Sequence, residues 1–129
     1  MIINVDDLLA KPYQRGARGP DGYDCWGVVI EVGKRMGIDF PDWADVNWRK
    51  STEAVVQDQA ASGDWKRIPV DQLTYGEIAV SKPMASGRHV GIHLGRGYVL
   101  HTTPRTGVLI DDINRYMLDN KGAVWAKRD

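Results

Sequence analysis

The stretch GYDCWGVVIEVGKRMG, residues 22–37, decides the expected fold, because a helix begins at the only cysteine of the chain. Apolar residues recur there at three- and four-residue spacing, which predicts a helix with one buried face over residues 25–36. Cys25 is open to two interpretations, a small buried apolar side chain or a nucleophile. The helix N-terminus favours the nucleophile, because its N–H groups and dipole stabilise a thiolate and an oxyanion.

The segments on either side of this helix predict an α+β domain. Before it we expect a short helix over residues 5–11 and a glycine-rich loop over residues 14–24. After it we expect a polar helix over residues 51–61, broken at residues 62–69. The strand-like segments are separated by glycine-bearing turns and predict an antiparallel meander, with one short helix (111–118) before the last strand; they are residues 77–81, 89–94, 98–103, 107–111 and 123–127. No repeat or linker divides the chain, so we expect a single domain over residues 1–129.

Composition excludes several classes of protein. Hydrophobic residues make up 43% of the 129 positions, which indicates a globular domain. The formal net charge is zero and the basic residues are scattered, so no nucleic-acid partner is expected. One cysteine cannot form an internal disulfide. No segment is apolar enough for membrane insertion, and the N-terminus lacks the features of a signal peptide, so we expect synthesis and folding in the cytoplasm.

A nucleophilic cysteine needs a base, and the chain offers His89, His93 and His101. A turn at residues 95–97 would set residue 91 opposite residue 101 in an antiparallel hairpin. His89 and His101 would then be diagonal neighbours on one face of the sheet. This arrangement supplies a base and a residue that orients it.

Other sites fit the sequence less well. Zinc binding by the histidines and Cys25 is disfavoured, because His89 and His93 would lie about 13 Å apart along a strand. The adjacent Asp111 and Asp112 point apart or cap a helix and make a poor glycosidase pair. Four tryptophans could line a substrate groove or pack in the core; they are Trp26, Trp43, Trp48 and Trp65.

Three motifs in order resemble the NlpC-type cell-wall peptidases, which are papain-like cysteine enzymes. The motifs are PYQRGARGPDGYDCWG (12–27), YGEIAV (75–80) and HVGIHLGRGYVLH (89–101). The resemblance implies a papain-like fold with the nucleophile at a helix N-terminus, packed on an antiparallel sheet. It also implies hydrolysis of an amide in the peptidoglycan stem peptide, between D-γ-glutamyl and a diamino acid, without a metal or organic cofactor.

The resemblance also implies roles for individual residues. Cys25 is the nucleophile, His89 is the general base and later the acid, and His101 orients His89. Tyr13 would bind the oxyanion or the substrate, and Asp24 the amino end of the peptide.

Two departures from the family pattern stand out. Trp26 replaces a serine that contacts substrate in many members, so we count it among the substrate-binding positions, and His93 replaces a tyrosine or similar residue. The Asp-Cys-Trp-Gly motif, the small size and the expected lack of a signal peptide resemble the phage-tail subgroup. That resemblance implies a virion tail protein that opens the wall beside other tail proteins. The alternatives are an amidase or acyltransferase with the same Cys/His pair, and a tail assembly protein with little activity.

Overall fold

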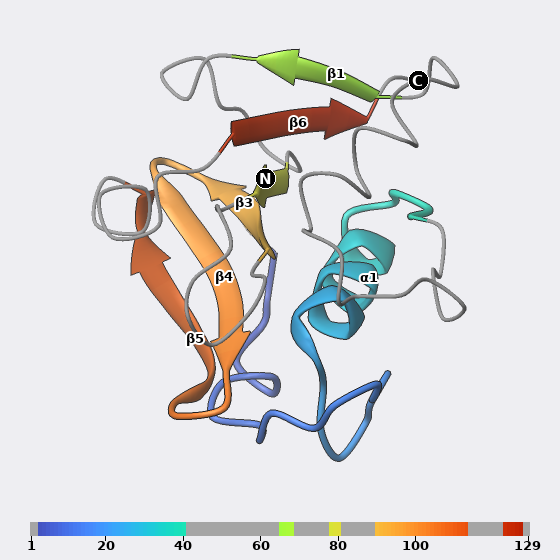
Figure 1. The fold of residues 1–129 in the computed structure, drawn as a ribbon, viewed down its shortest axis with the longest axis vertical. Helices are drawn as coiled ribbons and strands as arrows, with labels where there is room; N and C mark the ends of the chain where they lie inside the picture. Colours follow the sequence, from blue (N-terminus) through green and yellow to red (C-terminus); the bar gives the residue numbers. More distant parts are fainter. Residues whose placement is uncertain (1–2, 41–64, 69–77, 81–89, 114–122, 128–129) are drawn as a thin grey trace.

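The computed structural model describes residues 3–40, 65–68, 78–80, 90–113 and 123–127 (Figure 1). These residues contain one helix and six strands. Their bounds are α1 (Cys25–Arg35), β1 (Trp65–Ile68), β2 (Ile78–Val80), β3 (Val90–Gly95), β4 (Tyr98–Thr103), β5 (Gly107–Asp112) and β6 (Ala123–Lys127). This described part contains no helix with the length and hydrophobicity of a membrane span.

The strands form one sheet in the order β1-β6-β2-β3-β4-β5, and every neighbouring pair is antiparallel. The predicted meander is confirmed from β2 to β5. The last strand, however, does not extend the meander beside β5, because β6 lies between β1 and β2. The sequence prediction also missed β1, whose partner β6 is far away in the chain, so local patterns carry no signal for this pairing.

The predicted helix over residues 5–11 is wrong. This segment is a series of turns, with hydrogen bonds from Leu8 N to Val5 O (2.9 Å) and from Lys11 N to Leu8 O (3.1 Å). Ala10 has a positive φ of 67°, which a helix does not allow. Ala10 N donates to Val108 O and Val108 N donates to Lys11 O, both at 2.9 Å. Pairing with β5 therefore outweighs the helix propensity of a very short segment.

The predicted helix over residues 111–118 is wrong at its first two residues, because β5 continues through Asp112. Its end, from residue 114, and the predicted helix over residues 51–61 lie outside the described residues.

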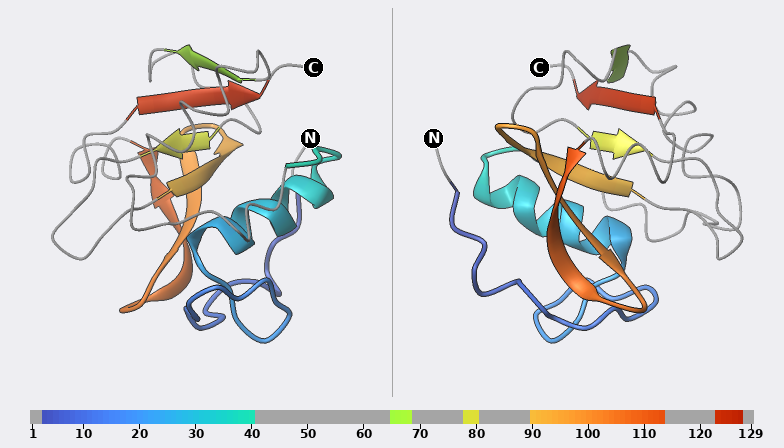
Figure 2. Two further views of the ribbon diagram at one scale, coloured as in Figure 1. Left: turned by 45° about the vertical axis from the view of Figure 1, so that its right-hand side comes forward. Right: turned by 90° about the vertical axis from the view of Figure 1, so that its left-hand side faces the viewer.

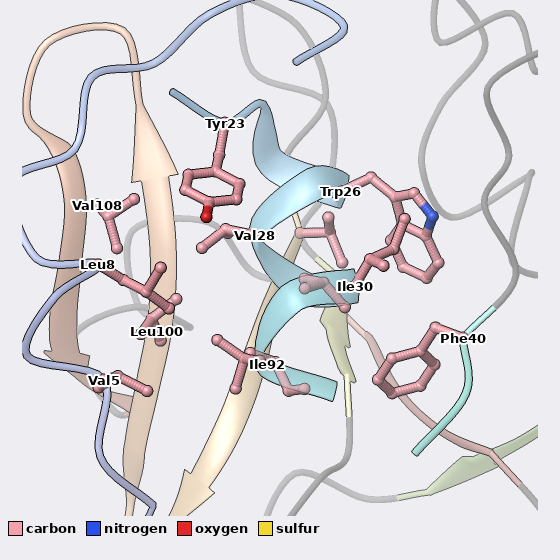
Figure 3. Packing of buried hydrophobic residues seen from close by; sticks show 13 residues of the cluster. Val5, Leu8, Tyr23, Trp26, Val28, Ile30, Phe40, Ile92, Leu100 and Val108 are labelled. Atoms are coloured by element: carbon pink, nitrogen blue, oxygen red, sulfur yellow. The ribbon is translucent and has the colours of Figure 1, made fainter. Parts of the chain in front are cut away.

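The hydrophobic core lies between α1 and strands β3 and β4 (Figures 1 and 2). Val28, Val29 and Val32 project from the buried face of α1, as the apolar spacing predicted. Figure 3 shows Val5 and Leu8 of the N-terminal segment closing this core beside β4 and β5. The core therefore fixes the start of α1 relative to the start of β3.

Candidate active site

The start of α1 is fixed by Asp24. Its backbone is extended (φ −86°, ψ −180°), and its Oδ1 accepts a hydrogen bond of 2.6 Å from the backbone N–H of Gly27. This is an N-cap, which satisfies one of the N–H groups that a helix end leaves unpaired. Cys25 is consequently the first residue of the helix, and its thiol lies at the helix N-terminus.

The loop before α1 is held against the same carboxylate. Arg18 Nη1 lies 2.7 Å from Asp24 Oδ1, and Asp24 N donates to Ala17 O at 3.1 Å. A Cβ on Gly27 would collide with the carbonyl oxygen of Ala17 and lie 2.9 Å from Asp24 Oδ1. The motif therefore needs glycine at position 27 for close packing. Arg18 was not among the predicted site residues; its one signal in the sequence was a basic side chain in the loop before an aspartate.

Tyr13 lies near enough to Cys25 and Asp24 for their charges to act on its hydroxyl, and its role in binding stays a prediction. The loop folds back through a bridge between Tyr13 and Tyr23, with Gln14 N donating to Tyr23 O at 3.1 Å. Burial raises the pKa of Tyr13, and the charges of Cys25 and Asp24 raise it further. The phenol is thus a protonated hydrogen-bond donor at neutral pH, close to both residues.

The described surroundings of Cys25 make its thiol a weak acid. Burial, followed by the charge of Asp24, raises the pKa of Cys25 to about 12. The backbone N–H groups of Trp26, Cys25 and Val90 act in the opposite direction but have less effect. The helix N-terminus thus acts in the expected direction, but among the described residues desolvation is the larger effect, so the pKa is raised rather than lowered. At neutral pH the thiol needs a base.

The thiol lies at the start of β3. The thiol is close to the backbone N–H of Val90, the first residue of β3. The residue before Val90 in the chain is His89, the predicted base, which itself lies outside the described residues. The contact with Val90 therefore brings the thiol to the end of the strand that His89 precedes.

The predicted register of the β3–β4 hairpin is confirmed. Ile92 pairs with Leu100, which sets Gly91 opposite His101. A Cβ on Gly91 would lie 2.6 Å from Val99 Cγ1 and 3.2 Å from His101 Cβ, so the close packing of β3 against β4 needs glycine at this position. A bulge between His93 and Gly95 shifts the register near the turn only.

His101 is buried on β4, next to β5. Its Nε2 lies 3.4 Å from Oδ2 of Asp111, which is within ion-pair distance but longer than a well-formed hydrogen bond. Burial lowers the pKa of His101, although Asp111 acts in the opposite direction. The imidazole is therefore neutral at pH 7.

Trp26 does not contact substrate through its side chain, so this prediction is wrong. The side chain is 0% exposed, and its ring packs against Phe40 with centroids 5.9 Å apart (Figure 3). Successive residues of a helix point about 100° apart, so the residue after a thiol at the surface of the core turns inward. The backbone N–H of Trp26 is the part of this residue that acts on Cys25.

Comparison with known proteins identifies the family. The sequence profile of the NlpC/P60 family matches residues 10–125. The chain belongs to the NlpC/P60 family. The NlpC/P60 domain of the peptidoglycan hydrolase SagA has a similar fold, with a TM-score of 0.61 at 22% identity over 94% of this chain and 90% of that one. NlpC2 from Trichomonas vaginalis has a TM-score of 0.63 at 21% identity over 93% of this chain and 42% of that one. The papain-like α+β fold is thus confirmed.

Two curated relatives carry this NlpC/P60 domain within longer proteins. A γ-D-glutamyl-L-lysine dipeptidyl-peptidase from Bacillus subtilis is 30% identical over 81% of this chain and 31% of its own length. A murein DD-endopeptidase/murein LD-carboxypeptidase from Escherichia coli is 27% identical over 95% of this chain and 54% of its own length. The chain therefore spans between a third and about half of these relatives.

His93 of this NlpC/P60 domain is part of the packed interior. Its side chain is 3% exposed, on β3 opposite Val99. We expect His93→Tyr to lower the free energy of unfolding by about 1–3 kcal/mol, because a larger ring must enter a filled site. Urea denaturation measures the difference, and the reverse substitution at an exposed site, Tyr98→His, is the matched control. Equal stability of both variants would contradict the expectation.

Metal ligands do not gather in the described ranges. No group of three or more His, Cys, Asp or Glu side chains there is placed to hold an ion. Among the described residues, His101 has the carboxylate of Asp111 within ion-pair distance, and these two side chains alone do not make a metal site.

Proposed function

We propose that this NlpC/P60 domain is a cysteine peptidase that hydrolyses an amide bond of peptidoglycan stem peptides. One observation carries the proposal: Cys25 begins α1, and its thiol lies against the backbone N–H groups of Cys25, Trp26 and Val90, the last of which begins β3. These parts correspond to a nucleophile, a donor for an oxyanion and the strand that follows a base. The names of the relatives support peptidoglycan as the substrate class.

In the proposed reaction, Cys25 Sγ attacks the carbonyl carbon of the scissile amide while His89 accepts the thiol proton. The backbone N–H groups of Cys25 and Trp26, which act on the thiol, would bind the oxyanion, whereas the N–H of Gly27 is used by the cap. When the tetrahedral intermediate collapses, the C–N bond breaks and the amine leaves with the proton from His89. Water, deprotonated by His89, then hydrolyses the thioester to a carboxylate and regenerates the thiol.

The bond that we propose lies between D-γ-glutamyl and the diamino acid of the stem peptide. The Bacillus subtilis relative is named for a γ-D-glutamyl-L-lysine substrate, which supports this bond, whereas the Escherichia coli relative is named for DD- and LD-bonds. Mass analysis of defined stem peptides incubated with the protein distinguishes the three. We expect a product with a new free amine on the diamino acid. Adding a chelator should leave the yield of this product unchanged, because the proposed reaction uses no metal.

Two results would contradict the proposed hydrolysis. A folded protein that releases no fragment from any stem peptide would overturn it. Transfer of the acyl group to an added amine, without release of a carboxylate, would indicate an acyltransferase.

We propose that the protein acts in a phage tail, where it opens the wall locally. The Asp-Cys-Trp-Gly motif at residues 24–27 supports this location by its resemblance to tail proteins. Mass spectrometry of purified virions tests the proposal, since the chain should be found among the tail proteins.

A further inference from the structure

We infer that Asp111 is a positioning residue, which holds the proton of His101 on Nε2 and thereby leaves Nδ1 to accept a hydrogen bond from the base. This inference deepens the proposed function and rests on it for the role of His101. It adds a fourth residue to the proposed set of nucleophile, base and orienting histidine.

The register of β4 and β5 brings the two side chains together. His101 pairs with Leu109, and Val99 pairs with Asp111, so Asp111 is the diagonal neighbour of His101 on the same face of the sheet. The distance from His101 Nε2 to Asp111 Oδ2 is 3.4 Å, and the two side chains are 7% and 19% exposed. This contact is therefore largely shielded from solvent.

The second carboxylate oxygen of Asp111 is also held. Asp111 Oδ1 accepts a hydrogen bond of 2.9 Å from the backbone N–H of Asp112. Oδ2 is thereby turned toward the imidazole. Asp112, the next residue along the strand, projects to the opposite face and is exposed.

The chemistry of the two groups selects one tautomer. A neutral imidazole has one N–H donor and one bare nitrogen, and an ionised carboxylate can only accept. A proton on Nε2 is attracted to Oδ2 across the 3.4 Å that separates the two atoms, although no hydrogen bond closes between them here, whereas a proton on Nδ1 would set a lone pair against the negative charge. With Nε2 protonated, Nδ1 is an acceptor, as an orienting residue requires. Hydrogen bonds of this type are often long in the free enzyme and shorten in the substrate complex.

The inference is tested by comparing the wild type with three variants of the full chain. Asp111→Ala removes the acceptor, Asp111→Asn keeps an uncharged amide oxygen, and Asp112→Asn is the matched control. The readout is ¹⁵N NMR of labelled histidine side chains at pH 7, which distinguishes the two neutral tautomers. We expect the Nε2–H form of His101 in the wild type and in Asp112→Asn, a mixture in Asp111→Ala, and partial retention in Asp111→Asn.

Steady-state kinetics supply the second readout. We expect Asp111→Ala to lower kcat about 10- to 100-fold with KM nearly unchanged, which is less than the loss of about 10⁴-fold seen when the residue that orients the base itself is changed. Asp111→Asn should lie between Asp111→Ala and the wild type. Thermal melting confirms that the variants are folded.

Two results would overturn the inference. One is a His101 tautomer that is Nδ1–H in the wild type or is unaffected by Asp111→Ala. The other is an unchanged kcat in Asp111→Ala when the wild type cleaves stem peptides. The NMR result needs no turnover, so a failure of the proposed function is recognised separately, by a wild type that cleaves nothing.

Discussion

Cys25→Ala is expected to abolish the hydrolysis of stem peptides, with a loss of about 10⁴-fold or more, because no other group replaces the attacking sulfur. The fold should survive, since Cys25 stands at the first position of α1 and alanine has the highest helix propensity. Mass analysis of the released fragments measures the activity, and thermal melting followed by circular dichroism measures the stability.

The matched control for this variant is Cys25→Ser. It keeps the size of the side chain but replaces the thiol with a much weaker acid and nucleophile, so it should be as inactive as the alanine variant. Activity close to the wild-type rate in either variant would exclude Cys25 as the nucleophile.

His89→Ala is expected to slow alkylation of Cys25 by iodoacetamide at pH 7 by about 100-fold or more. Without its base, the thiol keeps the surroundings that raise its pKa to about 12. A raised pKa means that the reactive thiolate is scarce below that value and increases with pH. The labelling rate of the variant should therefore continue to rise through the alkaline range, while that of the wild type reaches its plateau at lower pH. Hydrolysis should fall with the labelling rate.

Variants of the other histidines separate the base from residues that support it. His101→Asn should slow labelling and hydrolysis less than His89→Ala, because it keeps a hydrogen-bonding acceptor. Labelling of His89→Ala at the wild-type rate would mean that another group deprotonates Cys25.

The elements that follow from local sequence were predictable. The apolar spacing of α1 and the glycine-bearing turn after β3 are local signals, and both gave the observed helix and the observed pairing of Ile92 with Leu100. The pairing of β1 with β6 joins distant segments, and the turn at Ala10 is stabilised by hydrogen bonds to Val108. Neither contact leaves a pattern within its own segment.

The site was predictable where a motif determines it and not where tertiary structure does. Cys25 begins α1 and lies within electrostatic range of Tyr13, while the roles that the motif implied for the two residues stay predictions. The acidity of the thiol depends on how completely the fold removes water from it, which the motif does not encode. Arg18 and Asp111 were missed as contacts of Asp24 and His101, because each is recognisable only once the loop fold or the strand register is known.

Trp26 directly follows Cys25, the proposed nucleophile, and its side chain is fully buried, with Phe40 against its ring. The packing of these two buried aromatic rings therefore helps to determine the position of the Cys25 sulfur, although neither ring is placed to contact substrate. Selection for activity should therefore also act on the buried core, and positions 26 and 40 should vary together among homologous proteins. A substitution that changes the shape of either ring should lower kcat before it measurably lowers the free energy of unfolding.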